Sequence, residues 1–298
     1  MADVAHVAAL SQPRTDWTLF RRVASWKPVL LLTLLTWLYA PILGRLVRQW
    51  WTDPNFSHGF FVPLFSGFVV WQNRSRLAAI LPAGSTWGLP IILVALASLI
   101  MGVFGAELFL SRMSFILLIG GLVVFFLGWE MLREISFPLL FLVLMIPIPA
   151  ILLNQITFPL QVLASKVATW SLPLCGVPVL REGNIINLPA MPLEVAQACS
   201  GIRSLLSLMT LSIMYGYLLE KHLAMRIALA LASIPIAVVA NGLRIVGTGL
   251  LVQYWDPDKA EGFFHTFSGW LIFVVSLLML FAVHRCLHFF TRPNEASR

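Results

Sequence analysis

The chain contains 298 residues, of which 59% are hydrophobic and only 11% are charged, whereas about a quarter of the residues of a soluble domain carry charge. This composition excludes an ordinary soluble enzyme. The apolar runs of about 17–25 residues predict transmembrane α-helices, since they are too long for the strands of a β-barrel. The net charge of +7 matches the excess of Lys and Arg on the inner side of membrane proteins, so we expect a lipid bilayer and no nucleic acid as partner.

The hydropathy pattern, followed in chain order, predicts an all-α polytopic membrane protein with about eight transmembrane helices. The expected spans are residues 28–46, 57–72, 87–105, 109–128, 135–153, 201–219, 226–250 and 265–284. We expect one integral membrane domain over 28–285, between cytoplasmic tails over 1–27 and 286–298. The first apolar run is interpreted as an uncleaved span, because no small-residue cleavage site follows it.

The distribution of charge between the expected loops predicts a topology with both termini inside. An N-in arrangement places twelve of the 20 Lys and Arg residues on the inner side and seven of the 13 acidic residues on the outer side. This is the bias that the positive-inside rule describes. In this topology Cys199, Arg244, His265 and His58 all lie at the outer end of an expected span, so they share one face of the membrane.

The long connection before the sixth span, residues 154–200, predicts a small extracytoplasmic cap. Apolar residues recur at helical spacing over residues 156–170, which predicts an amphipathic helix in the membrane interface. Two apolar runs then flank Arg181-Glu182-Gly183-Asn184, which predicts a short hairpin. Two prolines favour an extended chain from the hairpin into Cys199.

Cys199 is the first candidate for covalent chemistry, because a thiolate is a strong nucleophile. Ser200, a favourable N-cap residue, follows it at the start of a helix-length apolar run, and a helix N-terminus stabilises an anion. Arg203, one turn further on, would stabilise the thiolate in the same way. The alternatives are a small residue packed between helices or, in an oxidising compartment, a disulfide with Cys175.

Arg244 is a cation inside an otherwise apolar run, and placing an arginine there costs at least about 2.5 kcal/mol on insertion scales. Such a residue usually has a partner or a function, although it can also snorkel to the interface. Asn241, one turn earlier, would face the same side and orient the guanidinium. A guanidinium held in this way suits the oxyanion that forms when a carbonyl is attacked.

His265 is the candidate proton donor, because a histidine exchanges protons near neutral pH. A histidine at the interface can also be structural. A metal site built from His58, His265 and Asp256 lacks the spacing of a ligand motif. The inner side holds three histidines that would not join it, namely His222, His284 and His288. We therefore expect neither a metal nor another cofactor.

Four motifs of this chain resemble those of the exosortase/archaeosortase family, and they follow one another along the chain in the same order. They are Ala198-Cys199-Ser200-Gly201-Ile202-Arg203-Ser204, Asn241-Gly242-Leu243-Arg244-Ile245, His265 followed by Gly269, and Ser57-His58-Gly59-Phe60 followed by Val62-Pro63. The resemblance covers most of residues 28–285 and is to a short bacterial exosortase without a fused soluble C-terminal domain. It implies a multi-span membrane cysteine enzyme whose fold differs from that of soluble sortases.

The resemblance implies that Cys199 is the nucleophile, that Arg244 stabilises the oxyanion and that His265 is the general acid and base. A substrate-binding or supporting role is expected for Ser200, Arg203, Asn241 and His58. For Arg203 we hypothesise contact with an acidic residue of the substrate, because its charge lies one turn from Cys199.

Members of this family are taken to cleave C-terminal sorting signals of exported proteins, which combine a motif such as Pro-Glu-Pro, a transmembrane helix and an Arg-rich tail. The implied partners are membrane-anchored substrates and an acceptor that is water, an amine or a glycan, in a process linked to exopolysaccharide. The implied location is the bacterial cytoplasmic membrane, with the active site on the periplasmic face. The alternative is a transporter or polysaccharide-export component without covalent chemistry, with Arg244 and His58 along a solute path.

Overall fold

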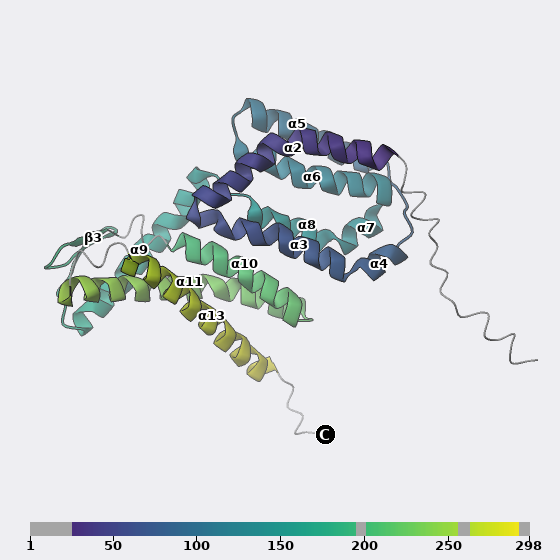
Figure 1. Cartoon of the computed structure of the whole chain (residues 1–298). Coiled ribbons are helices and arrows are strands. Elements are labelled where there is room, and N and C mark those ends of the chain that lie inside the picture. The colour runs from purple at the N-terminus through teal and green to yellow at the C-terminus, as the bar shows by residue number, and fades with distance from the viewer. Residues whose placement is uncertain (1–25, 195–200, 256–262, 292–298) are drawn as a thin grey trace, which may run out of the picture. The chain divides into compact units, whose positions relative to one another are not determined.

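The computed structural model describes residues 26–194, 201–255 and 263–291 (Figure 1). The chain divides into two compact units, residues 1–45 and 46–298, and each is described by itself. The first unit contains most of α2 (Trp26–Thr52), a long apolar helix that includes Pro41. The second unit contains every other described element and all the described site residues.

The second unit is helical apart from one small sheet. Its first half contains η2 (Pro54–Phe60), α3 (Phe61–Gln72), α4 (Arg74–Ala79), α5 (Gly88–Phe104), α6 (Leu108–Leu127), α7 (Trp129–Glu134), α8 (Ser136–Phe141) and η3 (Leu142–Met145). Its second half contains α9 (Ala150–Leu174), β1 (Leu180–Glu182), β2 (Ile185–Asn187), β3 (Pro192–Glu194), α10 (Ile202–Leu219), α11 (Leu223–Tyr254) and α13 (Phe263–Thr291).

The helices confirm an all-α membrane protein, but the count of eight spans is not confirmed. Among the described residues, five helices are long and apolar enough to cross a membrane, namely α2, α6, α10, α11 and α13. A sixth span results if the bent pair Ser136–Met145 and Ala150–Leu174 is counted as one. The helix α5 coincides with the expected third span, and its 17 residues are at the lower limit for crossing a bilayer.

The expected second and fifth spans are wrong as continuous helices. Residues 54–60 form a 3-10 helix because Pro54 starts a new turn and the Asp53 carboxylate accepts the N–H of Asn55 at 3.0 Å; only 12 residues of α3 follow. In the fifth, the helix ends at Met145 before Ile146-Pro147-Ile148-Pro149, and the chain bends by 81° into α9. Both prolines lack the N–H of a helical bond and disfavour helical conformation in the residue before them.

The cap segment contains a helix and a hairpin where its sequence predicts them, and the position of the helix in the membrane interface stays a prediction. The helix covers Ala150–Leu174, longer than expected and continuous through Pro159. The hairpin is confirmed: β1 and β2 pair antiparallel around Gly183, which has a φ of 64°. The strand β3 adds to β2, so the sheet has the order β1-β2-β3. One apolar core joins the sheet to α9 and α11; it contains Ala164, Ala168, Leu172, Val177, Ile186, Leu188, Ile245 and Val252.

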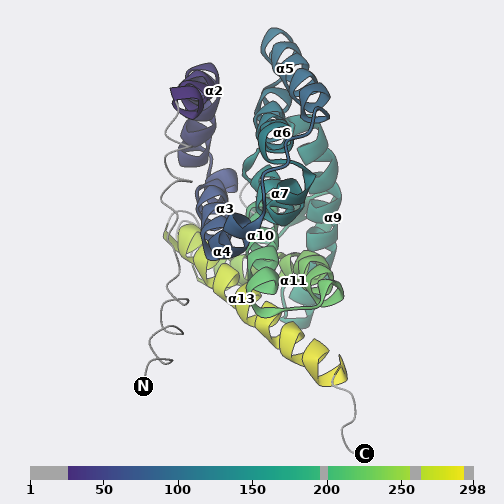
Figure 2. The ribbon, with the colours of Figure 1, turned by 90° about the vertical axis from the view of Figure 1, so that its right-hand side faces the viewer.

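Three helices of the second half pack on one another in every pairing, namely α10, α11 and α13. Figures 1 and 2 show them side by side, with α9 against α11. The short helix η2 also packs on α10, which brings the motif around His58 to this group of helices. The helix α13 continues to Thr291, into the expected C-terminal tail.

Candidate active site

The turn into α10 differs from the N-cap that the sequence predicts. Cys199 and Ser200 lie outside the described residues, but the helix begins at Ile202 with Gly201 as its N-cap. Gly201 has a φ of 63°, in the left-handed region. The expectation that Ser200 is the N-cap is therefore wrong. A glycine is favoured at this position because a Cβ is strained at positive φ.

Asn241 of α11 lies directly against this turn. A methyl group added at Gly201 would be 3.0 Å from Cγ and 3.1 Å from Nδ2 of Asn241, which is buried. A small pocket borders the contact, lined by Leu160, Gly201, Leu205, Ala237, Val238 and Asn241. The structure thus brings Asn241 of the α11 motif against Gly201, which lies two positions after Cys199 in the sequence.

Arg244 lies one turn beyond Asn241 on α11 and is partly buried. Its guanidinium faces α13, because a methyl group added at Gly269 would be 3.8 Å from Nη2 and 3.9 Å from Cζ of Arg244. His265 is in α13, one turn before Gly269, and its side chain lies outside the described part of the structure. The α11 motif therefore contacts both neighbouring motifs, at Gly201 and at Gly269.

Arg203 is exposed in the first turn of α10. Its charge is repelled by Arg244 and attracted by Asp53, the residue that caps η2. Two guanidinium groups therefore act on each other near the start of α10, and an anion there, such as a thiolate, an oxyanion or a substrate carboxylate, would be attracted to both.

His58 has a supporting position in the fold. Its ring is buried, and Nε2 lies 3.3 Å from the carbonyl oxygen of Leu144 in η3. Nearby, Nε1 of the buried Trp50 donates to the carbonyl oxygen of Met145 at 2.9 Å. These bonds satisfy carbonyl groups at the end of η3, where the helix is interrupted, and the bond from His58 holds η2 beside η3. Because η2 also packs on α10, His58 lies in the element that connects η3 to that helix.

The order and spacing of these motifs agree with a match to one known family. Residues 50–282 match the transmembrane exosortase family. The chain belongs to this family. Comparison with curated proteins and with solved structures returned no match. The family supports a membrane exosortase-type function for a multi-pass membrane protein; the matched region includes η2, the cap and all the candidate site residues.

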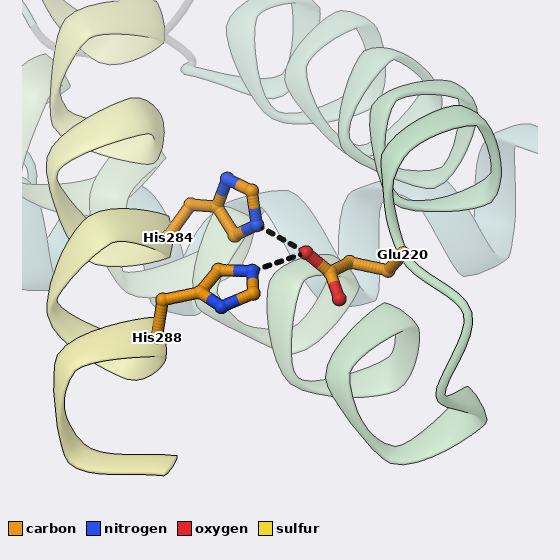
Figure 3. Close-up of side chains that lie close together, drawn as sticks. All are labelled: Glu220, His284 and His288. Atoms are coloured by element: carbon orange, nitrogen blue, oxygen red, sulfur yellow. Dashed lines mark hydrogen bonds and ion pairs between the residues drawn. The ribbon is translucent and has the colours of Figure 1, made fainter. Parts of the chain in front are cut away.

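A second polar cluster of this exosortase was not singled out from the sequence. Nε2 of His284 and Nε2 of His288 lie 2.5 Å and 2.6 Å from Oε1 of Glu220 (Figure 3). Burial raises the pKa of the Glu220 carboxyl, but hydrogen bonds from both histidines outweigh it and hold the pKa below its usual range. The spacing of His284 and His288, four apart on one helix, is the signal that could have indicated the cluster.

Proposed function

We propose that this exosortase is a membrane cysteine peptidase or transpeptidase that cleaves C-terminal sorting signals of membrane-anchored exported proteins. The observation that carries the proposal is the position of the α11 motif, which lies between the motif that leads into α10 and the motif in α13. Asn241 contacts Gly201, two residues after Cys199 in the sequence, and Arg244 lies against Gly269 on the helix that holds His265. Convergence of these motifs is what a shared acyl-transfer site requires.

In the proposed reaction, the Cys199 thiolate attacks the scissile carbonyl carbon, and a sulfur–carbon bond forms as negative charge moves to the carbonyl oxygen. The Arg244 guanidinium stabilises that oxyanion by donating hydrogen bonds. The carbon–nitrogen bond then breaks, and His265 gives a proton to the departing amine. Water, an amine or a glycan-linked acceptor attacks the resulting thioester and releases Cys199.

Asn241 and Arg203 support this reaction in different ways. The buried carboxamide of Asn241 holds the turn that follows Cys199 in place, as its contact with Gly201 indicates. Arg203 is exposed and electrostatically coupled to Arg244, so it suits an acidic residue of a sorting signal. We propose that the reaction takes place at the periplasmic face of the bacterial cytoplasmic membrane, where the positive-inside rule puts the start of α10.

The test is co-expression with a substrate that ends in a Pro-Glu-Pro motif, a transmembrane helix and an arginine cluster. Processing is followed as a change in substrate size on a gel, with the membrane level of each variant measured. We expect Cys199→Ala to abolish cleavage and Arg244→Ala to reduce its rate by about 100–1,000-fold, the usual loss for an oxyanion donor. Cys175→Ala and Cys286→Ala, at exposed cysteines, are the matched controls and should cleave normally.

Normal cleavage by Cys199→Ala, at wild-type membrane level, would contradict the thiol mechanism. It would favour the alternative function, a transporter or polysaccharide-export component. Arg203 is tested separately with Arg203→Ala and Arg203→Lys on substrates with Glu or Gln in the motif. We expect both variants at Arg203 to lose the preference for the substrate with Glu over the substrate with Gln. A preference for Glu that survives Arg203→Ala would assign acid recognition to another residue.

A further inference from the structure

The cluster of Glu220, His284 and His288 lies at the opposite end of α10 from the candidate active site. Glu220 follows the last residue of α10, and the two histidines are near the end of α13. The 18 residues of α10 separate the two ends by about 27 Å. The cluster therefore cannot contact the scissile bond of a substrate at Cys199, and it needs an explanation of its own.

The three side chains have the chemistry of a metal site. Two imidazole nitrogens and one carboxylate oxygen converge, and these atoms all lie within 4.8 Å of one another (Figure 3). Two histidines four apart on one helix face are a common way to hold zinc. A tetrahedral ion keeps its ligand atoms about 3.4 Å apart. The two contacts with Glu220, at 2.5 Å and 2.6 Å, would widen by about 1 Å, and any ligand pair as far apart as the 4.8 Å limit would close by a similar amount.

The surroundings hold these ligands in orientation. The hydroxyl of Tyr215 lies 2.6 Å from Nδ1 of His284. When Nε2 binds a metal, the ring hydrogen is on Nδ1 and would be donated to the Tyr215 oxygen, as outer partners of metal-bound histidines usually accept it. The backbone of Glu220 is also fixed, because its N–H donates to the Gly216 carbonyl and its own carbonyl accepts from Nε of Arg226.

Burial differs between the ligands in a way that leaves one side open. The side chains of Glu220 and His284 are 6% and 10% exposed, whereas that of His288 is 46% exposed. Three protein ligands with one side open to solvent leave a fourth position for water. The rival explanation is a purely hydrogen-bonded cluster, in which both Nε2–H groups donate to Oε1 of Glu220.

We propose that Glu220, His284 and His288 bind a divalent transition-metal ion, zinc in particular. This site differs from the expectation that the protein takes no metal. The ion joins the end of α10 to the end of α13, and the other ends of these helices hold the turn after Cys199 and His265. Its role is to fix the position of the two helices relative to each other, so it acts on the reaction through positioning and not at the reacting atoms.

The test uses the full chain, purified in detergent with an affinity tag that contains no histidine. The protein is stripped with a chelator, equilibrated with zinc and freed of excess metal before its zinc content is measured. We expect about one zinc ion per wild-type chain, and less than about a tenth of that in Glu220→Gln, His284→Asn and His288→Asn. Tyr215→Phe should weaken zinc binding about tenfold or more, since it removes an outer partner.

The matched control is His222→Asn, which removes an exposed histidine two residues from Glu220 and should keep full zinc content. His288→Asn tests the site even if the more buried variants do not fold. A Co²⁺-loaded sample should show visible absorption in the wild type and not in His288→Asn. Zinc content that is absent in the wild type, or unchanged in folded His288→Asn, would overturn the proposal. Either result would assign the cluster to hydrogen bonding without a metal.

Discussion

Replacing Gly201 by alanine should damage both stability and activity, because this residue meets two constraints at once. Its φ of 63° costs a residue with a Cβ about 1–2 kcal/mol. The added methyl group would also lie 3.0 Å from Cγ of Asn241, closer than the usual carbon–carbon separation of about 3.5–4.0 Å. Relieving that overlap adds about 1–3 kcal/mol, as overpacking in a filled region usually does.

The functional effect follows from which groups must move. Either Asn241 or the turn after Cys199 shifts by about 0.5–1 Å to restore ordinary contact. A displacement of about 1 Å at reacting groups can reduce a rate about a hundredfold, so we expect Gly201→Ala to lower processing about 10–100-fold. Membrane level should fall less than activity, since the change is local to one turn.

The matched control is Gly183→Ala in the loop between β1 and β2. Gly183 has a φ of 64°, but an added methyl group meets nothing within 4 Å, so only the backbone cost of about 1–2 kcal/mol applies. Unfolding is measured by titration with a denaturing detergent in mixed micelles, and processing is measured on a gel. If Gly201→Ala loses no more stability than Gly183→Ala and cleaves at the wild-type rate, the close contact with Asn241 is wrong.

Two further predictions concern packing around the site. Ile186→Ala should lower the free energy of unfolding by about 2–5 kcal/mol, because its side chain is fully buried in the core of the cap. Ile185→Ala, at a 36% exposed neighbour, should cost at most about 1 kcal/mol; equal losses would contradict the difference in burial between the two faces of the sheet. Trp50→Phe should cost about 1–3 kcal/mol through the lost bond to the Met145 carbonyl, whereas Trp51→Phe, at an 82% exposed residue, should stay within about 0.5 kcal/mol. Detergent titration measures both pairs, and matching values for Trp50→Phe and Trp51→Phe would contradict the role of Trp50 in holding η3.

Several elements were predictable from local sequence because their limits are set by local chemistry. The helix α6 covers Leu108–Leu127 where 109–128 is expected, and α10 covers Ile202–Leu219 where 201–219 is expected. In both, an apolar run ends at polar or glycine residues, which defines a helix without reference to the rest of the chain. The hairpin was predictable for the same reason, since Gly183 and Asn184 suit a tight turn.

Other elements depended on breaks that hydropathy does not register. An apolar run predicts one span over residues 57–72, but Pro54 and Asp53 start a 3-10 helix that leaves only 12 residues for α3. The run before α9 is apolar on both sides of Pro147 and Pro149, so its average hydropathy hides the 81° bend. Backbone bonding decides these breaks, and Trp50 and His58 supply partners for the carbonyl groups beside the second one.

The sequence by itself determined the membrane class, the motifs and the spacing that puts Asn241 and Arg244 one turn apart on α11. Only the tertiary structure decided that Asn241 contacts Gly201, that Arg244 lies against Gly269, and that Glu220 meets two histidines 64 and 68 residues away. The length and polarity of a run are properties of neighbouring residues, and they predict a helix. Which faces of two helices meet depends on side-chain packing across the whole unit, and no local pattern contains that information.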